Sequence, residues 1–115
     1  MTLTGKAKEE FEKWFANELE RTEQKLTELG RVHVVDEFYT RITESMQWGV
    51  YQDWADSLGH RLDVTVFYDQ MLGYVRGYEV KVNDKDIYRG GDVSETREEA
   101  RNAAVEKLNE LINDQ

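Results

Sequence analysis

The sequence predicts an α+β fold: a long N-terminal helix, then an α-β-β-β-α unit whose last helix covers a three-stranded antiparallel meander. Two observations lead to this class. Apolar residues recur every three or four positions in 5–29, 43–58 and the final segment, whereas they alternate with polar residues from Arg61 onward. At 115 residues the chain has the length of one domain, with a helical front (1–42) and the α-β-β-β-α unit (43–115).

The first helix is expected to run without interruption over residues 5–29. Thr4 is the candidate N-cap and Gly30 the candidate C′ residue, where a left-handed backbone costs glycine nothing. Such a helix can pair with a second copy of itself, which is one assembly role open to the chain. Its apolar stripe consists of Ala7, Phe11, Phe15, Leu19, Thr22, Leu26 and Leu29.

Residues 31–42 allow two interpretations. Val32, Val35 and Ile42 have helical spacing, but the run Val-His-Val-Val also suits a short strand. We predict a short connecting helix that Asp36 caps and that ends near Arg41.

The next helix is expected over residues 43–58, with Thr43 as its cap and Gly59 as its end. Gly49 inside it would permit a close crossing with another helix. Three aromatic side chains gather here: Trp48, Tyr51 and Trp54. Such residues form either a core face or an exposed hot spot for a protein partner.

Three strands follow. The first alternates about an apolar face made by Leu62, Val64, Val66 and Tyr68. The second places four residues on one face: Tyr74, Tyr78, Val80 and Val82. Residues 83–86 have the composition of a turn, so residues 87–89 are expected to form a third strand antiparallel to the second.

The last helix is expected to begin at Ser94 or Thr96, since Thr96 and Glu99 have the spacing of a capping box. The glycine pair at 90–91 before it suggests a phosphate loop, but carboxylates at 92, 95, 98 and 99 repel an anion, so we interpret the pair as a hinge. The stripe facing the sheet consists of Ala100, Ala103, Ala104, Leu108, Leu111 and Ile112.

Composition narrows the possible chemistry. The chain has no cysteine, which excludes disulfides and thiolate sites. Its two histidines, His33 and His60, lack the spacing of a metal site, and no nucleophile motif is present. We therefore expect no catalytic residues, no metal and no cofactor. No window approaches the ~20 apolar residues of a membrane span, so a cytoplasmic protein without membrane contact is expected.

The charge of −9 is carried by the helical segments, while residues 61–91 are balanced. A negative surface disfavours nucleic acid, because phosphate contact depends on clustered Lys and Arg. It suits solubility or a partner with a basic surface.

The order helix, three strands, helix over residues 43–113, together with the run SETREEARNAAVEKL, resembles the double-stranded RNA-binding domain. The resemblance implies that fold and binding to RNA through basic residues at the start of the last helix. The matching positions here are Arg97, Glu98 and Arg101, with Glu99 beside them. The acidic replacements remove the electrostatic contribution on which such binding depends.

The runs ESMQWGVYQDWADS, YEV and TREEARNAAVEKLNEL resemble small uncharacterised proteins encoded by bacteriophages and prophages. Many small acidic viral proteins of this kind block host proteins. The resemblance therefore implies an inhibitor of a host protein that binds nucleic acid, such as a CRISPR-type defence nuclease.

We thus expect a non-enzymatic protein-binding regulator or inhibitor whose host partner has a basic surface. The candidate contact residues are Trp48, Tyr51, Trp54, Asp92, Glu95, Glu98 and Glu99. The alternative is a nucleic-acid-binding module of the RNA-binding-domain type, which would use Arg61, Arg76, Lys81, Lys85 and Arg89. The oligomeric state stays open.

Overall fold

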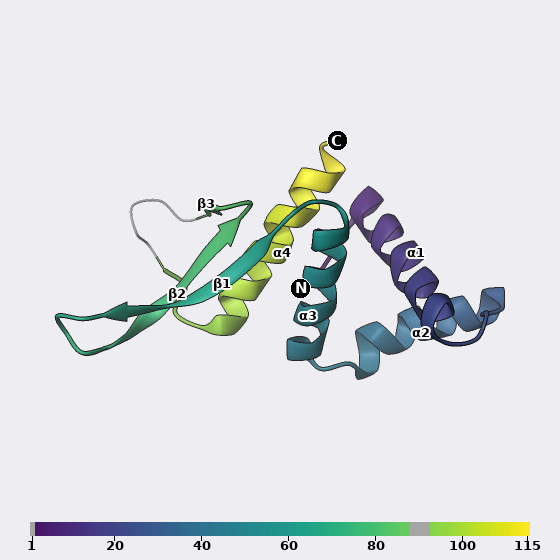
Figure 1. Cartoon of the computed structure of the whole chain (residues 1–115), viewed down its shortest axis with the longest axis horizontal. Coiled ribbons are helices and arrows are strands. Elements are labelled where there is room, and N and C mark those ends of the chain that lie inside the picture. The colour runs from purple at the N-terminus through teal and green to yellow at the C-terminus, as the bar shows by residue number, and fades with distance from the viewer. Residues whose placement is uncertain (1, 88–92) are drawn as a thin grey trace.

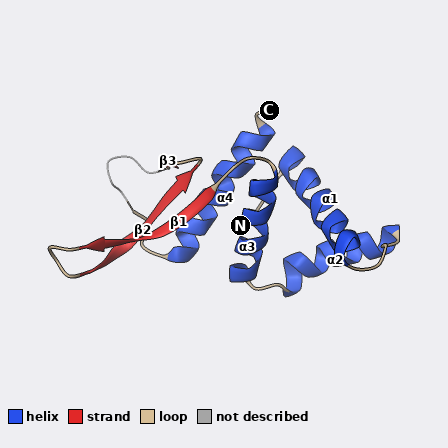
Figure 2. Cartoon of the chain, viewed as in Figure 1, coloured by secondary structure: helices blue, strands red, loops and turns tan. Residues whose placement is uncertain are grey.

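A computed structural model describes residues 2–87 and 93–115, which form four helices and a three-stranded antiparallel sheet (Figure 1). The predicted α+β class and the helix, three strands, helix order of the second half are confirmed (Figure 2). The elements are α1 (Gly5–Thr22), α2 (Glu28–Arg41), α3 (Glu44–Ser57), β1 (Leu62–Asp69), β2 (Tyr74–Val82), β3 (Lys85–Asp86) and α4 (Arg97–Asn113).

The prediction of one helix over residues 5–29 is wrong, because α1 ends at Thr22 and α2 begins at Glu28. The Thr27 side chain accepts a hydrogen bond from the Gly30 amide at 3.0 Å and so caps α2. Gly30 therefore lies in the first turn of α2, and Leu29 is 83% exposed. No uninterrupted stripe remains for pairing with a second copy.

The ambiguous segment 31–42 is almost entirely helical, since α2 continues to Arg41. Asp36 lies inside this helix, so its predicted role as a cap is wrong. An ion pair joins α2 to α1: Arg31 Nη1 lies 2.9 Å from Glu20 Oε1. The hydrogen bond from Arg31 lowers the pKa of Glu20 below its usual value. Phe38 is buried and marks the side of α2 that faces the core.

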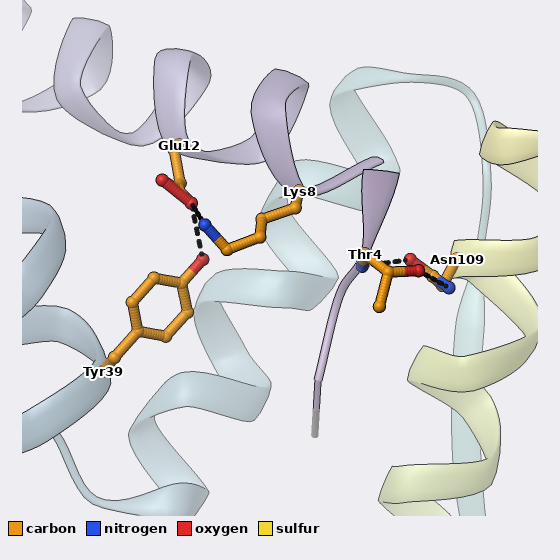
Figure 3. Close-up of polar contacts among 5 residues, drawn as sticks. All are labelled: Thr4, Lys8, Glu12, Tyr39 and Asn109. Carbon is orange, nitrogen blue, oxygen red and sulfur yellow. Dashed lines mark hydrogen bonds and ion pairs between the residues drawn. The ribbon is translucent and has the colours of Figure 1, made fainter. Parts of the chain in front are cut away.

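Helix α4 provides the cap that the start of α1 lacks. Thr4 occupies the N-cap position, but its side chain accepts no capping hydrogen bond. Instead Asn113 Oδ1 accepts a bond from the Ala7 amide at 2.8 Å. Asn109 Oδ1 accepts one from the Thr4 amide at 2.8 Å, as Figure 3 shows. Free amides at a helix start need such acceptors. The first and last helices are therefore joined by side chain to backbone hydrogen bonds.

The sheet has the order β1-β2-β3, with Leu62 opposite Val82 and Asp69 opposite Tyr74 in the β1–β2 pair. The chain turns into β3 through Asn83 and Asp84, both with positive φ. The described third strand is Lys85–Asp86, so pairing with β2 begins two residues before the predicted range of 87–89. Ile87 donates to the Val80 carbonyl at 3.0 Å, and residues 88 and 89 lie outside the described ranges. A two-residue turn with positive φ at both residues matches the twist of a hairpin. The third strand can therefore begin directly after Asp84, earlier in the sequence than predicted.

The core lies between α4 and the sheet on one side and the three other helices on the other. Phe11 of α1 is fully buried, and its ring centroid lies 4.8 Å from that of Tyr51 and 5.2 Å from that of Trp54. The predicted stripe of α4 is confirmed, with Ala103 and Leu111 half-buried and Val105 added. The prediction that Gly49 permits a close helix crossing is wrong. A Cβ at this position would meet no heavy atom within 4 Å, so no other helix approaches it closely.

The β1–β2 hairpin extends beyond the helix that covers it (Figure 1). Helix α4 begins beside Tyr78, whose ring centroid lies 5.4 Å from the Arg97 guanidinium carbon. Past this point the predicted apolar face of the first strand is uncovered, and Val66 and Tyr68 are 49% and 54% exposed. We call residues 66–76 the hairpin arm; its exposed large apolar side chains are Val66, Tyr68, Met71, Leu72, Tyr74 and Val75.

Candidate interaction surface

The three aromatic residues proposed as contacts lie in the core. Trp48, Tyr51 and Trp54 have exposed fractions of 7%, 0% and 1%. The prediction that they form an exposed hot spot for a partner is therefore wrong, and they pack in the core. The α3 helix turns this side toward Phe11 because aromatic area is the largest apolar area that the chain can bury. Burial, together with the charge of Glu12, raises the pKa of Tyr51 to about 12.

Helices α3 and α4 begin side by side at the same end of the fold (Figure 1), and the described acidic candidates lie at the start of α4. Thr96 caps α4 by accepting a hydrogen bond from the Glu99 amide at 3.1 Å, as predicted. Thr43 caps α3 in the same way, with the Met46 amide as donor. Both first turns carry carboxylates, which the helix dipole favours. We call Glu44, Glu95, Glu98 and Glu99 the acidic corner; Asp92 lies outside the described residues.

Two carboxyl groups of the acidic corner face each other across the two helices. Burial of the Glu44 carboxyl, followed by the charge of Glu98 and a hydrogen bond to it, raises the pKa of Glu44. The nearby Arg101 acts in the opposite direction but to a smaller extent. Glu44 Oε1 is enclosed and has no hydrogen-bond partner among the described residues. The corner therefore brings two like charges, those of Glu44 and Glu98, close to each other.

The arginines at the start of α4 do not neutralise this corner. Arg97 lies over the ring of Tyr78, and Arg101 lies over that of Trp48 and donates to Ser45 Oγ at 3.2 Å. Within residues 2–87 and 93–115, no ion pair reaches a carboxylate of the corner. On α1 and α2, by contrast, lysines and arginines pair with Glu10, Glu12, Glu18 and Glu20.

The described basic residues of the alternative hypothesis, all except Arg89, are dispersed over the sheet, each with a carboxylate nearby. Arg61 pairs with Asp63 at 3.0 Å and lies 3.9 Å from Asp84. Arg76 lies 4.0 Å from Asp69. Such pairing reduces the positive potential that phosphate binding requires.

Two further basic residues of the nucleic-acid hypothesis, Lys81 and Lys85, lie on β2 and β3. Lys81 stands opposite Asp63 on β1 and Asp86 on β3 in the strand register. Lys85 lines a groove that also contains Asp86, Glu106 and Glu110. Arg89 lies outside the described residues. The described part of the chain thus presents no continuous basic stripe.

Polar side chains elsewhere form structural contacts. Glu12 Oε2 lies 2.6 Å from Lys8 Nζ and accepts a hydrogen bond from the Tyr39 hydroxyl at 3.3 Å, which joins α1 to α2 (Figure 3). Burial, with the charge of Glu12, raises the pKa of Tyr39. His33 pairs with Glu37 at 3.0 Å, and His60 Nδ1 lies 3.0 Å from the Asn83 amide. The described residues contain no cluster of three side chains able to hold a metal ion.

The two larger grooves among the described residues differ in their lining. One of about 700 Å³ lies between α4 and the β2–β3 turn and contains lysines and carboxylates in similar number. A second, of about 470 Å³, lies among α1, α2 and α3 and is lined largely by apolar side chains, including Phe15, Ile42 and Val50. Neither groove brings together groups with complementary catalytic roles. Within the described ranges, no helix has both the length and the apolar content for crossing a bilayer.

Sequence reasoning missed two features of the surface. Glu44 follows the cap Thr43, so its place at a helix start was readable, but its position beside Glu98 depends on how α3 and α4 pack. The exposure of the hairpin arm depends on where α4 lies across the sheet, which no local pattern records. Comparison with protein-family models, curated proteins and solved structures finds no match to this chain.

Proposed function

We propose that this chain is a non-enzymatic protein-binding regulator or inhibitor whose partner carries a basic surface. The acidic corner supports the proposal more than any other feature. Within the described residues none of its carboxylates forms an ion pair, whereas Glu10, Glu12, Glu18 and Glu20 of α1 each do. Like charges held close together reduce stability and are common at functional sites.

The charge of the whole chain points to the same class of partner. At −9, the molecule attracts cationic surfaces over several ångströms and raises the rate of encounter with them. A groove that binds nucleic acid has the complementary sign, because it is built to contact phosphates. A host protein with such a groove is the proposed partner, and occupation of the groove by carboxylates would exclude its nucleic acid.

Affinity capture tests this proposal. The immobilised chain should retain a stoichiometric protein from a bacterial lysate at low salt and release it as salt rises, because exposed charges are screened. The Glu98→Lys/Glu99→Lys variant should lose at least tenfold in affinity for the captured protein.

A matched control is the Glu9→Lys/Glu23→Lys variant, which changes the net charge by the same amount at two exposed positions of the first-helix region. It should retain most of the affinity. Equal losses in both variants would show that net charge rather than the acidic corner directs binding, and the absence of any stoichiometric partner would contradict the proposal.

The nucleic-acid-binding alternative has its own measurement. A gel shift with double-stranded RNA or DNA at low salt should show no complex, since the sheet cations lie beside carboxylates. A shift that weakens as salt rises would favour the alternative.

A further inference from the structure

The outer edge of β1 presents unpaired backbone groups. In an antiparallel pair, alternate residues direct their N–H and C=O groups away from the partner strand. Arg61 directs its carbonyl to β2, where the Asn83 amide donates to it at 2.8 Å. Tyr78, opposite Val66, directs both its groups to Ser94 on the far side of β2. The alternation therefore turns the backbone of Leu62, Val64 and Val66 toward the free edge. The register shifts between Phe67 and Tyr68, but the Asp69 carbonyl accepts from the Gly73 amide at 2.8 Å, so Tyr68 before it again faces the free edge.

This edge lacks several of the features that usually prevent pairing, and the one irregularity of the β1–β2 pair is a register shift between Phe67 and Tyr68. Edge strands are commonly protected by lysine, proline or a covering segment. The β1 sequence LDVTVFYD contains neither residue, and β1 is the terminal strand in the sheet order. Among the described residues, one hydrogen bond reaches the backbone groups on this free edge: Gln52 Nε2 donates to the Leu62 carbonyl at 3.2 Å.

The side chains of β1 change from buried to exposed along the strand. Leu62 is 3% exposed and lies under α4, whereas Val66 and Tyr68 are 49% and 54% exposed on the same face. An antiparallel neighbour identical to β1 would place its buried end beside this exposed end. Each copy would then cover the apolar face that the other leaves open.

We infer that two copies of this chain pair through their β1 edges, antiparallel and in one register, to form a six-stranded sheet. Only registers in which even-numbered residues face even-numbered residues bring the outward backbone groups together and keep the apolar faces on one side. With Thr65 on the two-fold axis, Val64 faces Val66 of the partner copy and Leu62 faces its Tyr68. Arg61 then faces Asp69 of the partner copy, twice.

Charge selects this register over its neighbour. A shift that places Val66 on the axis would set Asp63 opposite Asp69 of the partner copy, and like charges directly opposite are destabilising. Residues 64–78 include one anion and one cation, Asp69 and Arg76, so the arms meet without net repulsion. The rest of each acidic chain repels its copy, and higher salt should therefore strengthen the dimer.

Sedimentation equilibrium of the full chain is the first test. The expected mass is twice the 13.5 kDa of the chain, with more dimer at higher salt. Thr65→Lys should shift the equilibrium at least tenfold toward monomer, since two cations would face each other on the axis. Thr22→Lys adds the same charge at the exposed end of α1 and should leave the mass unchanged.

Engineered cysteines test the register, because the chain has none of its own. Residues on the axis that form a non-hydrogen-bonded pair have Cα atoms ~4.5 Å apart, within disulfide range. Under mild oxidation Thr65→Cys should become a covalent dimer several-fold faster than Thr22→Cys. Equal rates, fastest crosslinking of Val66→Cys, or a monomeric mass up to ~1 mM protein would overturn the inference.

Discussion

At the scale of single residues, the core encloses one hydroxyl group that it does not satisfy. Tyr51 is completely buried, and its hydroxyl has no hydrogen-bond partner among the described residues. Such a group costs ~1–3 kcal/mol when it leaves water. The ring itself packs against Phe11 and Phe38, so the residue serves the core through its aromatic face.

Tyr51→Phe is expected to raise the free energy of unfolding by ~1 kcal/mol, because it removes the unpaired hydroxyl and keeps the ring. Urea denaturation followed by tryptophan fluorescence measures this change. Tyr39→Phe is the matched control: its hydroxyl donates to Glu12, so its loss should lower stability slightly. A decrease of 1 kcal/mol or more for Tyr51→Phe would show that the hydroxyl has a partner.

Glu44 links stability to pH. Its pKa is raised above the usual 4.5, so the folded state holds this proton more tightly than the unfolded state. The resulting stabilisation is complete below pH 4.5 and is lost as pH rises through the raised pKa. Glu44→Gln removes this dependence. We expect it to be more stable than the parent chain at pH 7, by ~0.5 kcal/mol or less for a partly hydrated pair.

Thermal unfolding of the two proteins between pH 4 and pH 7 measures the difference. The gap should close toward pH 4, where both side chains are neutral. A parent chain more stable than Glu44→Gln at pH 7 would mean that the ionised carboxylate has a favourable partner.

At the scale of elements, close approach of the backbone determines where the segment before α4 lies. A Cβ at Gly77 of β2 would come within 2.5 Å of the Ser94 carbonyl oxygen and 2.7 Å of Val93 Cγ2. Ser94 pairs with Tyr78 through two backbone hydrogen bonds of 2.9 Å. This contact positions the chain that leads into the acidic start of α4.

Gly77→Ala is therefore expected to lower the free energy of unfolding by ~1–3 kcal/mol, because backbone must move to admit the methyl group. Gly49→Ala is the opposite control: it adds the same methyl in a helix with open space around it and should gain up to ~1 kcal/mol. Chemical denaturation gives both values. Equal stability of the Gly77 variant and the parent chain would contradict the contact.

Local motifs predicted the elements well where one side chain determines the boundary. Thr43 and Thr96 cap α3 and α4 as expected, because capping depends on residues three positions apart. The break between α1 and α2 escaped prediction, since the apolar spacing continues through Leu26 and no proline or glycine stands at residues 23–26. Thr27 was the available signal, but a polar residue in a charged helix is easily interpreted as a solvated position.

The candidate site was less predictable than the fold. The acidic residues at the start of α4 follow from sequence position, whereas their meeting with Glu44 requires the packing of two helices. Trp48 and Trp54 have the composition of a binding hot spot, and only tertiary contacts show that they fill the core. The hairpin arm keeps its alternating pattern although its cover ends at Tyr78, because alternation records strand geometry and not what lies above it.

At the scale of the whole molecule, one aromatic side chain connects the helical front to the rest. Phe11 belongs to residues 1–42, yet its ring lies against Tyr51 and Trp54 of α3. Phe38 of α2 joins the same cluster, with its ring centroid 5.1 Å from that of Phe11. The two parts of the chain therefore share a core.

Phe11→Ala should lower the free energy of unfolding by ~3–5 kcal/mol, a large share of what a small domain possesses. Because the core is shared, unfolding should remain a single transition when followed by tryptophan fluorescence and by far-ultraviolet circular dichroism. Leu29→Ala, at a position 83% exposed, should change stability by less than ~0.5 kcal/mol. Two separate transitions in the parent chain would show that front and back fold independently.

The hydrogen bonds from Asn109 and Asn113 to the start of α1 also affect the order of events during synthesis. They join residues more than a hundred positions apart, so the first helix emerges from the ribosome long before its cap exists. Until α4 has been made, the amide groups at the start of α1 lack these acceptors, and contacts of such long range form slowly. A nascent chain arrested before residue 109 should therefore remain sensitive to protease near Thr4, at the start of α1, and become protected there only when α4 is complete.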